Sequence, residues 1–304
     1  MPITATGTQI NRSNIQLPNS VSSEILQKTQ EASIIMRLAR QIPLPGNGVQ
    51  IPVIASDPSA EWVTETGAKP VSTPTLDKKI MQAHKLAVIV PFSNEFRRDV
   101  PALYNALIAR LPGVLAEKFD NTVIFGPASG TLANFDNFSA VTGYALDAAN
   151  KTVYDGLVAA DGGIATAGGI MNGIVVAPQG KSKLLGAVDA NKRPLFTAGV
   201  DSSTLSPILG AETLVSKNVY KAGTAGSPGT PAVVGIAGDF SDARYGIVDG
   251  INISISDDAT LVTTGGIIST FQQNMVAVRV EAELAFAVKS ASEFNLLTGD
   301  VPSA

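Results

Sequence analysis

The sequence has 304 residues, of which 45% are hydrophobic and 16% charged, so it predicts a folded chain with enough apolar residues for two domains or one domain with a large insertion. It has no Cys and a single His, His84, which excludes disulfides, thiolate nucleophiles, zinc ribbons and nearly all His-based catalytic or metal chemistry. The net charge of −4 and the lack of a cluster of basic residues argue against a protein that binds duplex nucleic acid. The sequence shows no signal peptide and no apolar run of about 18 residues, which argues against a membrane protein.

The first 46 residues predict an arm followed by a helix. Residues 1–19 are rich in Thr, Asn, Ser and Gln with isolated apolar residues, so we expect an extended arm that needs a partner surface. From about Ser22 the apolar residues follow a helical spacing, and Arg37 and Arg40 are placed favourably for the end of that helix. Prolines at 43 and 45 stop it.

Two apolar runs, 48–54 and 86–92, enclose about thirty polar residues. This segment is too long for a tight turn, so it predicts a projecting two-stranded flap. Trp62, the only Trp of the chain, lies in it. Two alternatives remain open here: Trp62 is seated in a partner surface, or it packs under its own loop.

The remainder predicts a long helix, a mixed region and a long strand. Residues 93–126 carry Leu or another apolar residue at every fourth position, and Pro112 is expected to kink or divide the helix. Residues 141–266 alternate short apolar runs with Gly-rich turns. Residues 275–289 alternate with a period of two, which predicts a strand with Arg279, Glu281 and Glu283 on one face.

Chemical motifs are few. Gly180, Lys181 and Ser182 match the last residues of a phosphate-binding loop, but Val175 stands where that loop requires its first glycine. We therefore expect no nucleotide and no other cofactor. A set of four carboxylates could serve a soluble hydrolase or a metal ion, although neighbouring Ser and Thr residues favour exposed turns and no spacing matches a calcium loop. The four residues are Asp239, Asp242, Asp257 and Asp258.

Several stretches together resemble the HK97-fold major capsid proteins of tailed bacteriophages, over nearly the whole chain. The stretches that carry the resemblance are EAS at 31–33 with MRLA at 36–39, AEWVTETGAKP at 60–70, PFSNE at 91–95, GDFSDARYGI at 238–247 and NMVAVRVE at 274–281.

The resemblance implies an α+β, HK97-like capsid fold with an N-arm, an extended β-hairpin loop, a peripheral domain and an axial domain. The implied parts are residues 1–48 as the N-arm with a short helix, 49–92 as the extended loop, 93–140 as the peripheral domain with its spine helix, 141–266 as the axial domain, and 267–304 as the closing strand of the peripheral domain.

By the same resemblance the chain is a structural subunit, not an enzyme, that assembles through pentamers and hexamers into an icosahedral shell around phage DNA, without sequence-specific DNA binding. Portal and scaffolding proteins are the implied partners, assembly takes place in the bacterial cytoplasm, and the final location is the virion capsid. Met1 is followed almost directly by the arm, so any scaffold is expected to be a separate protein. An encapsulin-type compartment that encloses enzyme cargo is the alternative shell.

The resemblance also implies contacts between subunits from the flap and from the start of the following helix. The residues are Glu61, Trp62, Glu65, Lys69, Lys78, Lys79, Arg97 and Arg98.

Some members of the family join a flap Lys, followed by Pro, to an Asn of another subunit through an isopeptide bond, with a Glu as general base. Lys69-Pro70, Asn274 and Glu281 stand at matching positions. Seven residues of extended strand span roughly 23 Å, so one chain cannot present both Asn274 and Glu281 to one Lys, and the bond would form only after assembly. The alternative is that Lys69 and Glu281 form interfacial salt bridges and Asn274 caps the start of the strand.

Overall fold

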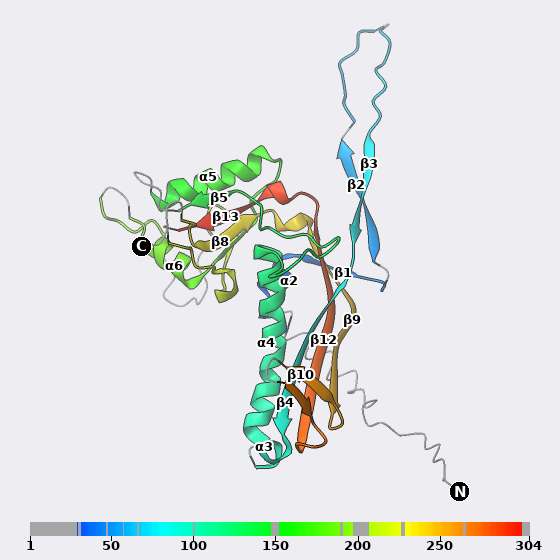
Figure 1. Ribbon diagram of the computed structural model, residues 1–304. Coiled ribbons are helices and arrows are strands. Elements are labelled where there is room, and N and C mark those ends of the chain that lie inside the picture. The colour runs from blue at the N-terminus through cyan, green and yellow to red at the C-terminus, as the bar shows by residue number, and fades with distance from the viewer. Residues whose placement is uncertain are drawn as a thin grey trace. The chain divides into compact units, whose positions relative to one another are not determined.

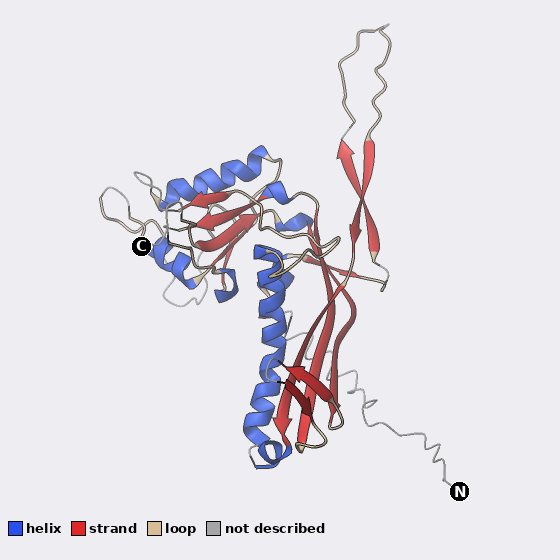
Figure 2. Ribbon diagram, viewed as in Figure 1, coloured by secondary structure: helices blue, strands red, loops and turns tan. Residues whose placement is uncertain are grey.

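The computed structural model describes residues 29, 32–46, 48–56, 58–65, 67–99, 101–146, 152–188, 191–196, 207–225, 229–263 and 266–299 (Figure 1). Helices and strands alternate irregularly along it, as expected for an α+β fold (Figure 2). The elements are α2 (Ile34–Leu38), β1 (Arg40–Pro43), β2 (Val49–Ser56), β3 (Thr75–Met81), β4 (His84–Ser93), α3 (Asn94–Asp99), α4 (Pro101–Phe125), β5 (Gly143–Ala145), α5 (Val153–Thr166), β6 (Gly173–Val176), α6 (Pro178–Leu185), β7 (Glu212–Val215), β8 (Val233–Gly238), β9 (Ala243–Ser256), β10 (Thr260–Thr263), β11 (Gly266–Ser269), β12 (Met275–Val288) and β13 (Phe294–Thr298), with 3₁₀ turns η2 (Lys217–Val219), η3 (Phe240–Asp242) and η4 (Ala291–Glu293).

The chain forms two compact units. Unit 1 takes its described residues from 1–33, 85–117 and 249–284, and unit 2 takes them from 34–84, 118–248 and 285–304. The unit boundaries at 117/118, 248/249 and 284/285 fall inside α4, β9 and β12.

A four-stranded sheet has the order β1-β9-β12-β4, and its two central strands are 14 residues long. The strand predicted over 275–289 is confirmed as β12, in which Arg279 is exposed and Glu281 and Glu283 are half-buried while Val278, Val280 and their apolar neighbours are buried. This alternation follows from the period of two, which sends successive side chains to opposite faces of a sheet.

The long helix predicted over 93–126 is present as α3 and α4, but Pro112 does not divide α4, which runs continuously for 25 residues. Proline removes one helical hydrogen bond at a cost of about 3 kcal/mol. Leu111 and Leu115, on either side of Pro112, are buried, and so are Phe119 and Val123 further on. We infer that packing of this apolar stripe outweighs the lost hydrogen bond.

Unit 2 contains a five-stranded sheet with the order β5-β13-β8-β6-β7, in which β8 pairs antiparallel with both β13 and β6. The helix α5 begins at a capping box, in which Thr152 and Asp155 each accept the other's backbone N–H. Asn295 of β13 donates from Nδ2 to the Ala160 carbonyl at 2.8 Å and so ties α5 to the sheet.

Phenylalanine rings form a continuous series of contacts within unit 2. Phe286 lies at its centre, fully buried, with the Phe138 ring 5.6 Å away in a T-shaped arrangement. Such edge-to-face pairs stabilise beyond the apolar area they bury. The other rings in the chain of contacts are Phe119, Phe135, Phe294 and Phe240.

The predicted flap is a hairpin whose first strand, β2, begins in the first apolar run and whose second strand, β3, lies in the polar segment. β2 pairs antiparallel with β3, from Val49↔Met81 to Ser56↔Thr75, whereas β4, the second apolar run, belongs to the four-stranded sheet. The polar residues 75–81 become a strand because β2 supplies a partner for their backbone groups, which local hydrophobicity does not reveal.

The predicted arm, residues 1–19, and the start of the predicted helix lie outside the described residues. The described part of the helix, α2, ends earlier than expected, and Arg40 is a correction: it opens β1, paired in parallel with Arg244 of β9, rather than ending a helix. None of the described helices combines the length and hydropathy needed to cross a bilayer.

Candidate functional site

The connection between β2 and β3 exposes large apolar side chains. Trp62 is as exposed as in an extended peptide, at 105%, and Val71 is 90% exposed. Within the connection, Ser59 donates its backbone N–H to the Ser72 hydroxyl at 2.9 Å, which holds its two sides together. Of the two alternatives for Trp62, packing under its own loop is therefore wrong for the single chain. Seating of Trp62 in a partner surface stays a prediction.

The predicted contact residues Glu61, Glu65 and Lys69 share this connection with Trp62, and all three are exposed. The predicted contacts Arg97 and Arg98 lie on α3 in unit 1 and are exposed as well. The side-chain hydrogen bond to Asp99, 2.8 Å from Nε to Oδ1, raises the pKa of Arg98 above its ordinary value. Arg98 is thus paired with its neighbour in the chain.

Lys78 and Lys79 are adjacent on β3 but have different environments. Lys78 is exposed, whereas Lys79 is half-buried and lies 2.6 Å from Asp136 Oδ2 through Nζ. Lys79 also donates to the Val288 carbonyl, and the Val288 N–H donates to Asp136 Oδ2 at 2.8 Å. We call Lys79, Asp136 and Val288 the root cluster, because it fixes β3 to the end of β12.

Apolar contacts reinforce the hairpin beside the root cluster. Met81, the last residue of β3, is fully buried and packs in one cluster with Ile51 of β2 and with Leu44, Ala285 and Ala287. His84 Nε2 lies 2.8 Å from the Ala133 carbonyl oxygen and donates a hydrogen bond to it in the tautomer that carries the proton on Nε2. The lone His therefore has a structural contact, as is usual for an isolated histidine.

The three candidate crosslinking residues are placed as follows. Asn274 is exposed in the turn before β12 and has a positive φ of 50°, which Asn tolerates better than most residues. Glu281 lies on β12 with Oε1 3.1 Å from Nε of Arg279. Lys69 belongs to unit 2, whereas Asn274 and Glu281 belong to unit 1.

Asn94, which the sequence did not single out, holds Asn274. Its backbone N–H donates to the Asn274 carbonyl at 3.0 Å, and its side-chain Nδ2 donates to Asn274 Oδ1, also at 3.0 Å. Asn94 is the first residue of α3. Both residues occur in stretches on which the family resemblance rests, but nothing in their spacing indicates that they meet.

Asp239, one of the four candidate carboxylates, is part of a turn. Its Oδ2 accepts from the Ile170 N–H at 3.1 Å and its Oδ1 from Asn172 Nδ2 at 2.7 Å. Burial alone would raise the pKa of Asp239, but these hydrogen bonds and those from Ser241 outweigh it and hold the pKa below its ordinary value. A carboxylate that accepts from four donor groups of three residues stabilises its turn.

The other three carboxylates do not form a site with it. Asp242 Oδ2 lies 3.6 Å from Lys289 Nζ in unit 2. Asp257 and Asp258 lie in an exposed turn of unit 1, as the alternative of the sequence analysis expected. Among the described residues, no three His, Cys, Asp or Glu side chains gather as a metal ion would need.

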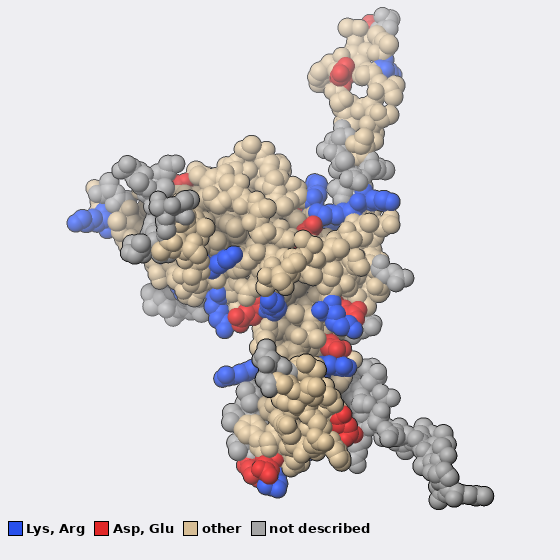
Figure 3. Space-filling model, in the orientation of Figure 1, with Lys and Arg blue, Asp and Glu red and all other residues tan. Residues whose placement is uncertain are grey.

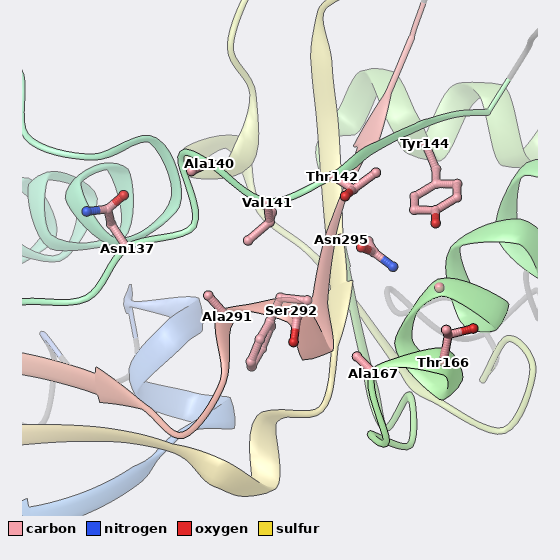
Figure 4. Close-up of a pocket in the computed structure, with 12 residues that line it drawn as sticks. Asn137, Ala140, Val141, Thr142, Tyr144, Thr166, Ala167, Ala291, Ser292 and Asn295 are labelled. Carbon is pink, nitrogen blue, oxygen red and sulfur yellow. The ribbon is translucent and has the colours of Figure 1, made fainter. Parts of the chain in front are cut away.

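A pocket of about 480 Å³ lies in unit 2 beside α5, η4 and β13 (Figure 4). Tyr144, Thr166 and Asn295 supply polar groups to it, and none of the described residues lining it is Asp, Glu, Lys, Arg or His. Such a lining offers hydrogen-bonding groups but no carboxylate, imidazole, ammonium or guanidinium group. Over the face drawn in Figure 3, charged side chains of both signs form small separate groups with no continuous basic stripe.

Comparison with known proteins decides the family. The model of the Phage capsid family matches residues 14–299. The chain belongs to the Phage capsid family. Its members are structural proteins, so this phage capsid protein is not an enzyme, and the hydrolase alternative is wrong. Its location is the virion capsid.

Individual relatives agree with this assignment. The chain is 30% identical to the probable major capsid protein gp17 of Mycobacterium phage D29, covering 92% of this chain and 89% of the relative. It is 26% identical to the major capsid protein of Staphylococcus phage 80alpha, covering 92% and 84%.

Solved structures show the same fold at lower identity. A chain from Mycobacterium phage Ogopogo matches with a TM-score of 0.72 at 20% identity, covering 88% of this chain and 92% of that one. The capsid of an empty GTA particle matches with a TM-score of 0.63 at 15% identity, covering 90% of each chain. The predicted HK97-like fold is thereby confirmed at the level of the fold.

Proposed function

We propose that this capsid protein is the subunit that assembles with copies of itself, through pentamers and hexamers, into an icosahedral shell around phage DNA. The observation that carries the proposal is the family match over residues 14–299. The relatives described above are proteins of phages, which favours a phage shell over an encapsulin-type compartment.

Within this shell, each part of the chain has an assigned place. Residues 1–48 form the N-arm with its short helix, 49–92 the extended loop that contains β2 and β3, and 141–266 the axial domain. Residues 93–140, with α4 as the spine helix, and 267–304, with β12, form the peripheral domain. The lengths of α4 and β12 and the hairpin pairing of β2 with β3 support this assignment.

The extended loop overlaps a neighbouring subunit. Burying Trp62 and Val71 against a neighbour would remove from water two side chains that the single chain leaves exposed, at a gain of about 1.5–3 kcal/mol for each large apolar side chain. The polar rim of this contact is supplied by the charged residues Glu61, Glu65, Lys69, Lys78, Arg97 and Arg98. Lys79 is assigned differently, because its ammonium group is engaged in the root cluster.

Two measurements on the purified chain test this function. Negative-stain electron microscopy should show closed shells, alone or with an added scaffolding protein. Because Trp62 is the only Trp, its fluorescence reports on the hairpin alone, and its emission should shift to shorter wavelength on assembly. Closed shells with unchanged emission would contradict the hairpin contact, and a monodisperse small oligomer under all conditions would contradict the shell.

Two substitutions of Trp62 test whether assembly needs an apolar ring at this position. Trp62→Ala should reduce the yield of shells, whereas Trp62→Phe should retain most of it, because Phe keeps an apolar ring. Neither variant should change the stability of the unassembled subunit, since an exposed side chain makes few contacts there.

The packaged DNA is held without sequence-specific contacts. The net charge of −4 fits a container whose wall does not bind phosphates tightly. Portal and scaffolding proteins complete the assembly.

In the assembled shell, Lys69 of one subunit is joined to Asn274 of another through an isopeptide bond. Neutral Lys69 Nζ attacks Asn274 Cγ, a C–N bond forms, the bond to Nδ2 breaks, and the proton lost by Lys69 leaves with the ammonia. Glu281 of a further subunit accepts this proton from Lys69 and then passes it to the leaving Nδ2 group. It does so through the carboxylate oxygen that Arg279 does not hold. If no bond forms, Lys69 and Glu281 are salt-bridge partners.

A denaturing gel of assembled shells tests the bond. A ladder of covalent oligomers should appear in the wild type and disappear in Lys69→Arg, which keeps the charge but cannot supply a neutral amine. A single 31.4 kDa band from wild-type shells would contradict crosslinking.

A further inference from the structure

The turn that carries Asn274 is held by its own backbone hydrogen bonds. The Gln273 N–H donates to the Ser269 carbonyl at 3.1 Å, and the Met275 N–H donates to the Thr270 carbonyl at 2.8 Å. The backbone of Asn274 is therefore fixed on both sides, in the left-handed region at φ 50°.

The remaining freedom of Asn274 is the rotation of its side chain, and Asn94 restricts it. Asn94 Nδ2 donates to Asn274 Oδ1 at 3.0 Å, while its backbone N–H holds the Asn274 carbonyl at the same distance. Among the residues that the structure describes, the Asn274 Nδ2 group makes no hydrogen bond. The carboxamide is thus bound by its oxygen and open at its nitrogen.

This arrangement suits nucleophilic attack on the carboxamide. As an amine adds to Cγ, negative charge develops on Oδ1, and a donor already aimed at that oxygen stabilises the charge without reorganising. The group that must leave, Nδ2, is the one left unbound. Asn274 is also exposed, so an amine from another chain can approach it.

We propose that Asn94 activates and orients Asn274 for crosslinking, with its Nδ2–H group acting as the oxyanion donor. The inference rests on the crosslink proposed above, and it adds the residue that makes Asn274 a better electrophile than other exposed asparagines. The overall exchange remains a lysine amine and a carboxamide giving a secondary amide and ammonia.

The test uses assembled shells and follows the rate at which the covalent ladder appears. Asn94→Asp is nearly the same shape and suits the first turn of a helix, but it replaces the donor by an acceptor. Asn94→Ala removes the donor without adding charge. We expect both variants to slow crosslinking by about tenfold or more, at unchanged shell yield.

Asn134→Asp is the matched control. Asn134 also has a positive φ, 55°, and also donates from Nδ2 to a side-chain amide oxygen, that of Gln82 at 3.3 Å. Shells of the Asn134→Asp variant should crosslink at the wild-type rate. Introducing Asn94→Asp into the Lys69→Arg background, which cannot crosslink, measures any structural effect of the substitution on shell stability by itself.

The outcomes are distinct. A wild-type ladder that forms equally fast in Asn94→Asp and Asn94→Ala would overturn the role of Asn94 and leave the crosslink intact. No ladder in wild-type shells would overturn the crosslink and this inference with it. If Asn94→Asp in the Lys69→Arg background forms no shells, Asn94 is needed for the structure of the turn, and the inference is overturned.

Discussion

The carboxylate of Asp120, in the C-terminal half of α4, accepts the backbone N–H of Ile34 through Oδ2 at 3.2 Å and so caps the first residue of α2. Asn218 Nδ2 donates to the same oxygen, Oδ2, at 3.0 Å, and the other oxygen, Oδ1, accepts from the Ile35 N–H at 3.4 Å. Asp120 is fully buried. Removing a buried acceptor leaves its donors without a partner in the interior, which costs free energy.

We therefore expect Asp120→Ala to lower the free energy of unfolding of the unassembled subunit by about 3 kcal/mol or more, because two backbone donors and one amide lose their acceptor in the interior. Urea denaturation followed by circular dichroism measures the change. Glu117→Ala, at an exposed position of the same helix, is the control and should change stability much less. Equal effects of the two substitutions would contradict the capping role.

The root cluster predicts unequal roles for two adjacent lysines. Lys79→Met should lower the free energy of unfolding by about 1–3 kcal/mol, since Asp136 loses a charged partner in a half-buried site. Lys78→Met should change it by about 0.5 kcal/mol or less, because Lys78 is exposed. Hydrogen exchange at the β3 amides should quicken in Lys79→Met only, and equal exchange in both variants would argue against the cluster.

Gly238 predicts a packing constraint at the end of β8. A Cβ at this position would overlap the ring of Phe294, which is fully buried. Gly238→Ala should therefore destabilise the subunit by about 1–3 kcal/mol. Gly162→Ala is the control, because a Cβ on Gly162 of α5 meets no atom within 4 Å, and replacing a helical Gly by Ala should gain up to about 1 kcal/mol. Thermal unfolding distinguishes the two, and a stable Gly238→Ala subunit would contradict the overlap.

Glu293 predicts a pH dependence of stability. Burial raises its pKa above the ordinary value of 4.5; Lys289 lowers it and the nearby Asp242 and Asp239 raise it further. The folded state thus binds the proton more tightly than the unfolded state, so this contribution to stability falls as the pH rises from about 4.5 through the folded pKa. Glu293→Gln should be more stable than the wild type at pH 7 and should lose this part of the pH dependence.

Asp239 serves as the control of opposite sign. Its pKa is lowered, so the stability it contributes is present above its ordinary value of 3.8 and is lost as the pH falls through the folded pKa. Asp239→Asn should therefore destabilise the subunit most at neutral pH. Stability curves from pH 3 to 8 with the same sign of change for both variants would contradict these assignments.

The sequence by itself determined the features that repeat along the chain. The alternation over β12, the every-fourth apolar residues of α4 and the polar flap with Trp62 all depend on local periodicity, because a period of two or 3.6 decides which side chains share a face. The family could be predicted from the sequence as well, because the stretches that resemble it are each contiguous in the chain.

Only the tertiary structure decided which distant residues meet. The pairing of β2 with β3 rather than β4, the strand at Arg40, the continuity of α4 through Pro112, and the contacts of Lys79 with Asp136 and of Asn94 with Asn274 each join segments that no local pattern connects. The physical reason is that a backbone group or a charge takes its partner from whatever the folded chain brings within about 3 Å, and packing elsewhere in the core decides what that is.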